Sequence, residues 1–315
     1  MRFVVITTLN IPTKNWLGPF LFFVVMTTFS SVHAHHTGAS QDIQKTTRFI
    51  DPFTGKREQP ANYVVITQDY YKGTNENSNI ANTTVFAEMP LAQGKFAINA
   101  SVPYTYFDQK NRSDAARIGK TYLGGKYYPF FDTNKNYFIV FDGAVGFPSG
   151  NDTDRFTGGN YYTGSGFMTF GYLFGQWSVL VRGGGIQPLS RQYPTNVNDN
   201  DGIPYWLRPP ASPTPATNYE LKKTTIWTAY LTYYFKPELS FFVGFLFRTP
   251  YQGVDFDLRT KDRIPTVFRE NSIGLSYNFS EQYTMSFTYR YPTTRRPSDL
   301  KLYEEAYTIA FSFQL

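Results

Sequence analysis

Histidine is the residue on which a hydrolytic site most often depends, and this chain has only three, His33, His35 and His36. Phospholipases, proteases and deacylases of outer membranes generally need a histidine as the base or to orient the base. All three histidines lie close to the N-terminus, directly after an apolar segment, and the chain has no cysteine that could act as a nucleophile. The sequence therefore predicts that the protein is not an enzyme.

A metal or cofactor site is equally poorly supported. His35 and His36 could bind a metal ion beside a free amino terminus, or they could form a flexible end, which we expect. The stretch NDNDG at residues 198–202 resembles a calcium-binding loop. An EF-hand, however, needs an acidic residue or Asn where Val197 stands and a Glu where Arg208 stands. We predict neither a metal nor a cofactor.

Five basic residues fall on the polar parity of their predicted strands and therefore share the polar face. They are Lys120, Lys126, Arg182, Arg248 and Arg290. Around a lumen these side chains would form a basic track that favours anionic or polarisable solutes. Alternatively, they pair with carboxylates of the same face, such as Asp142 and Glu270, and simply fill the interior.

A second candidate binding element is the long connection at residues 188–222, which contains four large aromatic residues in a proline-rich context. They are Tyr193, Tyr205, Trp206 and Tyr219. Exposed Tyr and Trp side chains commonly anchor a protein partner. The same side chains could instead pack this connection over the mouth of a barrel.

The segments that carry these residues repeat with a period of two. In Ala306–Leu315, five apolar residues alternate with small and polar ones. Strict alternation predicts a strand with one apolar and one polar face. Twelve such segments are predicted, at residues 62–71, 79–88, 94–107, 117–130, 136–147, 160–174, 176–187, 223–235, 238–248, 267–279, 282–291 and 306–315. No segment predicts an amphipathic helix.

The predicted connections alternate between short and long. Tight turns, such as Gly175 and Lys236–Pro237, follow the even-numbered strands, whereas long polar stretches such as 188–222 and 249–266 follow the odd-numbered ones. Outer-membrane barrels have short turns at the periplasmic end and long loops outside. A soluble sandwich has no reason to sort its connections in this way.

The N-terminus predicts export. Arg2 and Lys14 are the only charged residues before position 42, and the apolar run 16–29 is followed by a small-residue cleavage pattern that ends at Ala34. We therefore predict a signal peptide at 1–34, a polar periplasmic segment or plug at 35–61, and a barrel at 62–315. The alternative, an uncleaved anchor, is disfavoured because about 20 apolar residues are needed to span a membrane.

Composition favours a membrane barrel over a secreted sandwich or lipocalin-type barrel. Phe, Tyr and Trp make up 19% of the chain, which is more than one soluble core needs, yet the mean hydropathy is only −0.37. Backbone groups in hydrocarbon must all be paired, so closed barrels and helices are the structures that span a membrane. We predict an all-β, antiparallel, up-and-down transmembrane barrel of about twelve strands. The net charge of +6 has no dense basic block, so no nucleic-acid partner is expected.

Two stretches resemble a known family. RIGKTYLGGKYYPF (117–130) is followed, after one further strand, by GFPSGNDTDRFTGGNYYTGSGFMTFGYLF (146–174). This layout resembles the MetA-pathway phenol-degradation family, in which a G-D-x-x-L-G-x-K-Y strand precedes a strand ending in P-T-G. Lys120 stands where that pattern has Asp, and Ser149 where it has Thr. The matching residues are Gly119, Leu123, Gly124, Lys126, Tyr127, Pro148 and Gly150. The family is similar to outer-membrane transporters of fatty acids and aromatic hydrocarbons, which implies passage of small, including hydrophobic, molecules and assigns no binding residue.

The sequence thus predicts a bacterial outer-membrane channel or transporter for passive passage of small molecules. Its expected partners are outer-membrane lipid, a small-molecule solute and the barrel assembly machinery, which would bind the strand Ala306–Leu315. The alternative is a surface structural or adhesive barrel that binds partners through its long loops. The sequence identifies neither the solute nor the oligomeric state, and it does not determine whether the lumen is open.

Overall fold

The computed structural model describes residues 60–73, 79–108, 115–131, 136–148, 162–189, 223–249, 267–280, 282–293 and 303–315. Contacts divide the chain into two units, residues 1–38 and 39–315, and every described residue belongs to the second. No helix among these residues is long and apolar enough to cross a membrane.

The described residues form strands and one short 3₁₀ helix, η1 (Ala92–Gly94). The strands are β1 (Tyr63–Lys72), β2 (Asn79–Leu91), β3 (Phe96–Asp108), β4 (Ala115–Ile118), β5 (Thr121–Phe131), β6 (Tyr137–Phe147), β7 (Thr163–Phe174), β8 (Trp177–Pro188), β9 (Thr224–Tyr234), β10 (Leu239–Thr249), β11 (Phe268–Asn278), β12 (Tyr283–Pro292) and β13 (Glu305–Gln314). Each falls within a few residues of a predicted segment.

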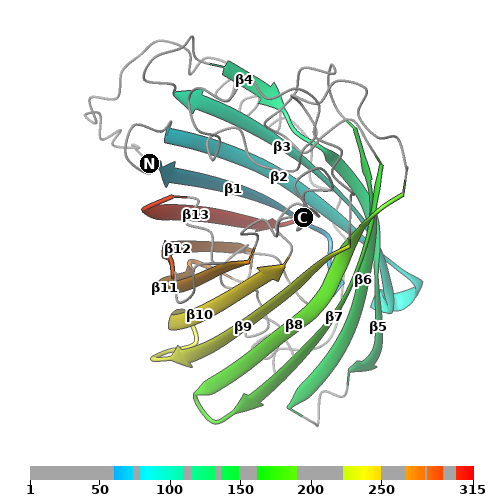
Figure 1. Cartoon of the computed structure of the whole chain (residues 1–315). Coiled ribbons are helices and arrows are strands. Elements are labelled where there is room, and N and C mark those ends of the chain that lie inside the picture. Colours follow the sequence, from blue (N-terminus) through cyan, green and yellow to red (C-terminus); the bar gives the residue numbers. More distant parts are fainter. Residues whose placement is uncertain are drawn as a thin grey trace, which may run out of the picture. The chain divides into compact units, whose positions relative to one another are not determined.

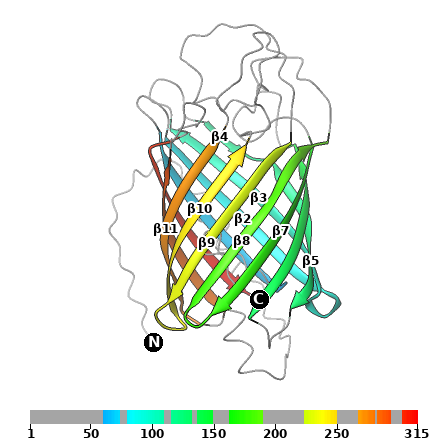
Figure 2. The same ribbon diagram turned by 60° about the horizontal axis from the view of Figure 1, so that its bottom comes forward.

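The sheet closes on itself, as Figures 1 and 2 show. Strands that follow each other along the chain pair antiparallel, except that β4 and β5 both pair with β3, and β1 pairs with β13 from Tyr63 opposite Gln314 to Lys72 opposite Glu305. Closure removes the free edges of the sheet, so the apolar terminal strand is paired on both sides. Since β4 and β5 together occupy one place in the wall, the barrel is twelve-stranded, as predicted.

The split between β4 and β5 is the one departure from the predicted strand at 117–130. Tyr104 faces Ile118 and Ser101 faces Tyr122, so three residues of the β4–β5 side oppose two residues of β3. This is a β-bulge, in which one extra residue breaks the ladder and re-aims the side chains beyond it. The amide of Gly119 donates to the carbonyl of Pro103 at 2.7 Å.

The two rims of the barrel are defined here by their connections. The turn rim carries η1, Gly175–Gln176 and the bends at residues 235–238 and 279–280. The opposite end, the loop rim, is where the long connections begin, and these lie outside the described residues. Gly175 has φ +59°, a left-handed conformation that glycine adopts at no steric cost. The predicted sorting of short turns to one end is confirmed.

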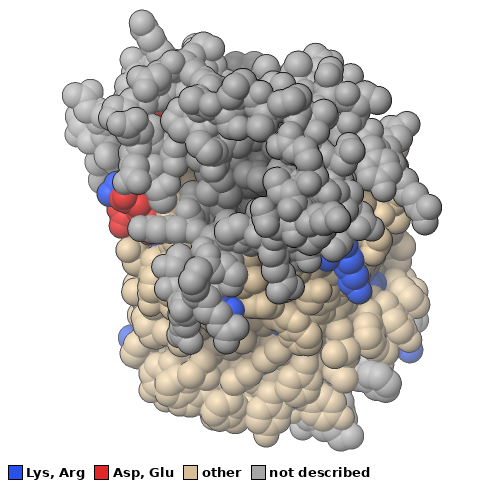
Figure 3. Space-filling model, viewed as in Figure 1, with Lys and Arg blue, Asp and Glu red and all other residues tan. Residues whose placement is uncertain are grey.

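Burial separates the two faces of the wall. In β13, Thr308, Ala310 and Ser312 are buried and point into the lumen, whereas Ile309 and Phe311 are exposed on the outside. The same alternation holds in β11 and β12. Figure 3 shows an outer wall with few charged side chains, as a surface against lipid requires.

Aromatic side chains gather on the outer face at both rims. Near the turn rim they form contacting pairs with centroids 4.7–5.9 Å apart: Trp177–Tyr233, Tyr277–Phe279, Tyr172–Phe174 and Tyr283–Phe313. Near the loop rim, Tyr289 contacts Tyr307 and Tyr291 at 5.5 and 6.0 Å. Such girdles occur where a transmembrane barrel meets the two interfaces, so they place the hydrocarbon layer between the rims.

Glycine is required at some wall positions and tolerated at others, which gives a test of the packing. A Cβ at Gly171 on β7 would overlap the buried ring of Phe138, whereas a Cβ at Gly166 on the same strand would meet nothing within 4 Å. We expect Gly171→Val to lower the unfolding free energy by about 1–3 kcal/mol, because overpacking displaces neighbours. Gly166→Val should change it by less than about 0.5 kcal/mol. Urea unfolding in lipid vesicles would measure both, and equal losses would contradict this packing.

Candidate solute path in the barrel lumen

All five predicted basic residues lie in the described part of the chain, and the wall aims them inward. Two of them belong to a line of ions at mid-depth. Nζ of Lys126 (β5) lies 2.9 Å from Oε2 of Glu88 (β2), and Nη2 of Arg182 (β8) lies 2.6 Å from Oδ1 of Asp142 (β6). Lys126 and Asp142 stand directly opposite each other on β5 and β6. Cations and carboxylates therefore alternate along this wall.

A second ionic group, the Arg290 triad, consists of Arg290, Asp69 and Glu270 and lies nearer the loop rim. Arg290 Nη2 is 2.9 Å from Oδ1 of Asp69, and its Nη1 is 3.6 Å from Oε2 of Glu270. The hydroxyl of Thr308 donates to the same Asp69 oxygen at 2.6 Å, and the Arg290 guanidinium lies 4.8 Å from the centre of the Tyr71 ring. All three ions are at most 8% exposed. Together with Thr308 of β13 they join β1, β11 and β12, and therefore span the β1–β13 seam at which the barrel closes.

Lys120 and Arg248 complete the basic set. Lys120 follows Gly119 in the bulge and is only 4% exposed. Its aliphatic stem lies against Gly146 of β6, where an added Cβ would come within 2.8 Å of Lys120 Cδ. Arg248 stands at the loop end of β10, opposite Ile226 and Phe268. The bulge therefore returns Lys120 to the lumen after Ile118, which is exposed outside.

The described lumen face thus holds five cations and four carboxylates. Sequence reasoning named Asp142 and Glu270 as partners, and both form ion pairs. Asp69 and Glu88 were not identified from the sequence, although each occupies a position of its strand that faces the lumen. Because three of the cations contact carboxylates, the field of the predicted basic track is largely compensated.

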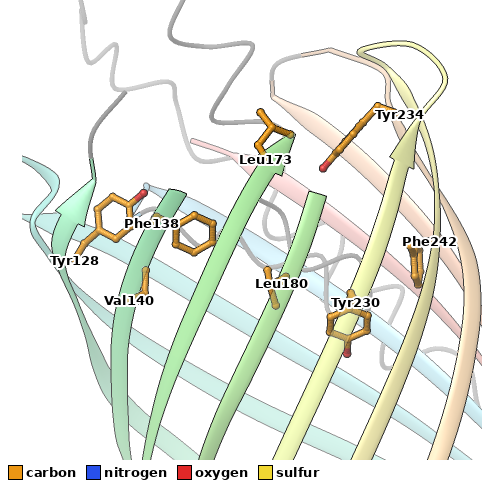
Figure 4. Close-up of a cluster of buried hydrophobic side chains, with 8 residues drawn as sticks. All are labelled: Tyr128, Phe138, Val140, Leu173, Leu180, Tyr230, Tyr234 and Phe242. Atoms are coloured by element: carbon orange, nitrogen blue, oxygen red, sulfur yellow. The ribbon is translucent and has the colours of Figure 1, made fainter. Parts of the chain in front are cut away.

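An apolar cluster lines one side of the lumen near the turn rim, as Figure 4 shows. Its members are buried side chains on strands β5 to β10, which project from the wall at similar depth: Tyr128, Phe138, Val140, Leu173, Leu180, Tyr230, Tyr234 and Phe242. The rings of Tyr230 and Phe242 are 6.4 Å apart and edge-on, and the hydroxyl of Tyr234 is 3.2 Å from that of Ser178. The sequence indicated apolar residues in the lumen through Phe242 and Leu246, which both fall on the polar parity of β10.

Hydroxyl groups line the other side. Strands β11 to β13 present a row of buried small polar residues, here called the hydroxyl stripe: Ser272, Ser276, Thr284, Ser286, Thr288, Thr308 and Ser312. The hydroxyl of Thr284 donates to Oδ1 of Asn278 at 2.8 Å. Buried hydroxyls such as Thr169, Ser178 and Thr232 also lie on the strands of the apolar cluster, so the lining is mixed, with its longest run of hydroxyls on β11–β13.

Several predicted features lie outside the described residues. Among them are the aromatic residues of the 188–222 connection, namely Tyr193, Tyr205, Trp206 and Tyr219. The three histidines, the expected cleavage site after Ala34 and residues 35–59 also lie outside. Within the described ranges, no group of three His, Cys, Asp or Glu residues could hold a metal ion.

A closed, twelve-stranded antiparallel barrel with an apolar outer wall, aromatic girdles and a charged lumen is the architecture of outer-membrane β-barrel proteins. No protein-family model and no curated protein matches the chain.

Solved structures do match. The COG4313 outer-membrane channel of Pseudomonas putida F1 aligns with a TM-score of 0.56 at 11% identity, over 84% of this chain and 98% of the channel. The NanC porin aligns with a TM-score of 0.49 at 13% identity, over 80% and 100% of the two chains. The CymD monoaromatic hydrocarbon channel gives 0.40 at 11% identity, over 89% and 94%. The outer-membrane phospholipase A of Escherichia coli gives 0.39 at 10% identity, over 80% and 95%. The first of these likenesses shows a shared fold, and the lower scores of the others carry no argument.

Proposed function

We propose that this protein is an outer-membrane channel for the passive passage of small molecules through its lumen. The observation that supports it is the mixed lining of the lumen, in which the apolar cluster lies beside buried hydroxyls and ion pairs on β5–β10, and the hydroxyl stripe and the Arg290 triad line β11–β13 and β1. Eight-stranded barrels are just filled by their own side chains, and the interior widens with strand number. Twelve strands therefore leave room for more than the wall's own side chains.

The lining suits amphipathic solutes that combine an apolar or aromatic body with hydrogen-bonding groups. Aromatic and aliphatic side chains such as Phe242 and Leu180 would contact the body, while hydroxyls and ions would bind the polar end. This solute class agrees with the resemblance to the MetA-pathway phenol-degradation family, which we retain as part of the proposal. The turn rim would face the periplasm, and β13 would be the strand that the assembly machinery binds.

The test is single-channel conductance of the protein, purified from outer membranes, in planar bilayers. Liposome swelling with small aromatic acids and with sugars of similar size would accompany it. Discrete conductance steps and faster swelling with the aromatic acids support the proposal. Absence of both from folded protein would refute it.

The Asp142–Arg182 pair should set ion selectivity. Asp142→Asn leaves Arg182 without its 2.6 Å partner and raises the positive excess of the lumen. We expect the reversal potential in a salt gradient to move towards that of chloride. Arg182→Gln should move it towards that of the cation. Lys236→Gln, at the turn between β9 and β10, serves as the control with little effect, and equal shifts for all three variants would contradict the assignment.

A further inference from the structure

The lumen face is buried along much of the wall but stays accessible on one part of it. On β11, β12 and β13 almost all inward side chains are buried, and the apolar cluster is buried near the turn rim. Beyond that cluster, towards the loop rim, six inward residues of β6 to β9 are only half-buried. They are Ala144, Ser165, Phe167, Arg182, Gly184 and Ile226, here called the accessible patch. A solute in the lumen would therefore contact these residues before the buried parts of the wall.

The wall of the accessible patch carries little side-chain bulk. Gly124 of β5 stands opposite Ala144 of β6, and Ala144 stands opposite Ser165 of β7. Glycine within a strand often marks a place where a ligand or another backbone approaches closely. A flat molecule can therefore lie against this wall in contact with the backbone.

Arg182 is held beside this wall in a fixed orientation. Its Cζ lies 4.3 Å from the centre of the Phe167 ring, and its Nη2 lies 2.6 Å from Oδ1 of Asp142. The ring in turn lies on the backbone of Gly184, where an added Cβ would come within 2.5 Å of Phe167 Cδ1. Stacking on one face and a carboxylate at one edge define the plane of the guanidinium before a solute arrives.

The same contacts place the guanidinium next to the small residues. Asp142 and Phe167 are opposite each other on β6 and β7. Ala144 and Ser165 form the next inward pair along the same two strands, towards the loop rim. A group bound to Arg182 from the lumen would therefore lie at the edge of the bare wall.

Accessibility distinguishes Arg182 from two other cations of the lumen. Its side chain is 28% exposed, whereas those of Lys126 and Arg290 are 8% and 5% exposed. A guanidinium has five N–H donors in a planar fork that matches a carboxylate. Arg182 can therefore bind the carboxylate of a solute in addition to that of Asp142.

We propose that the accessible patch binds planar aromatic carboxylates, with the carboxylate on Arg182 and the ring against Ala144, Ser165 and Phe167. The carboxylate gains charge-assisted hydrogen bonds, and the ring covers a bare wall that is flanked by the apolar side chain of Ile226. An uncharged aromatic molecule lacks the first contribution, and a short carboxylate lacks the second. The proposal rests on the proposed function, narrows its solute class to acids and assigns the residues that bind them.

The test is equilibrium dialysis of benzoate against the folded protein, purified from outer membranes, in detergent at neutral pH. Benzyl alcohol serves as the uncharged counterpart, and acetate as the carboxylate without a ring. We expect benzoate to bind about tenfold or more tightly than either, since each lacks one of the two contributions. Arg182→Gln should weaken benzoate binding by about tenfold or more and leave the binding of benzyl alcohol unchanged.

Arg269→Gln is the matched control. Arg269 also lies over a phenyl ring, with its Cζ 5.5 Å from the centre of the Phe247 ring, but both residues stand on the outward parity of β11 and β10. The affinity for benzoate should not change in this variant. Equal losses in the two arginine variants, or an unchanged affinity in Arg182→Gln, would overturn the proposal.

Two further variants apply if Arg182→Gln does not fold. Arg182→Lys keeps the charge but lacks the planar fork, so it should still weaken benzoate binding several-fold. Ala144→Leu fills the bare wall and leaves Arg182 in place, so it should weaken the binding of benzoate but not that of acetate. Benzoate and acetate that bind equally to the original protein would indicate a general anion site, and Ala144→Leu without effect would place the ring elsewhere. Either result contradicts the proposal.

Binding and transport are separate readouts. Saturable benzoate binding that depends on Arg182, in a protein that shows neither conductance nor liposome swelling, would support the site and refute the channel. Conductance without saturable benzoate binding would leave the channel and refute the site.

Discussion

Replacing Arg290 with Met should lower the unfolding free energy by about 3–5 kcal/mol, because a buried ion group that loses one partner leaves uncompensated charge behind. Arg290 contacts Asp69 at 2.9 Å and Glu270 at 3.6 Å, and the two carboxylates are 8% and 3% exposed. Without the guanidinium they would repel each other across the β1–β13 seam. Urea unfolding in lipid vesicles, followed by tryptophan fluorescence, would measure the loss.

The neutral triple variant is the matched control. Adding Asp69→Asn and Glu270→Gln to Arg290→Met removes the charges but keeps hydrogen-bonding groups of the same size. Since the penalty comes from unpaired charge, most of the stability should return, as it does when buried ion groups are replaced together. A single variant within about 0.5 kcal/mol of the original, a size typical of surface changes, would show that the Arg290 triad is hydrated and energetically unimportant.

The strands were predictable because their residues alternate, and alternation is a local property. Residues of β13 such as Thr308 and Ile309 fall on the predicted faces. The bulge at Gly119 was not predictable in this way, because it depends on which residues of β3 lie opposite. Pro103, whose carbonyl accepts the Gly119 amide, is distant in sequence. Pairing across the wall, rather than propensity within a segment, decides such a site.

The alternation of residues along each strand predicted which charged side chains face the lumen. It did not predict which residue each of them pairs with. Parity placed Arg290 and Lys126 in the lumen. Which carboxylate each one meets depends on strand register and on closure, since Asp69 and Arg290 are 221 residues apart in the chain. The sequence predicted a run of cations along the lumen. In the structure Asp69 and Glu88 contact Arg290 and Lys126, so cations and carboxylates alternate instead. Their acidic type and inward parity were the available signals, and these could have been read from β1 and β2.

A charge on the lipid face of the same wall should be costly in proportion to its depth. Ile273 lies at the middle of β11 and is 44% exposed on the outer face, opposite Val243 and Tyr289. Ile273→Arg should lower the unfolding free energy by about 2–4 kcal/mol, the cost of a basic residue at the bilayer midplane. Urea titration in vesicles would detect it as a lower midpoint with an unchanged slope.

Tyr277 provides the matched position, because it lies on the same strand and the same face but in the aromatic girdle at the turn rim. It is 42% exposed, close to the 44% of Ile273, so the two positions differ mainly in depth. Tyr277→Arg should cost only about 0–1 kcal/mol, because the guanidinium reaches the interface there. Equal costs at the two positions would mean that the outer face does not contact hydrocarbon. A soluble barrel would then be the better description. Alternating strands and closure occur in soluble and in transmembrane barrels, whereas a loss of unfolding free energy that depends on depth is expected only in a membrane.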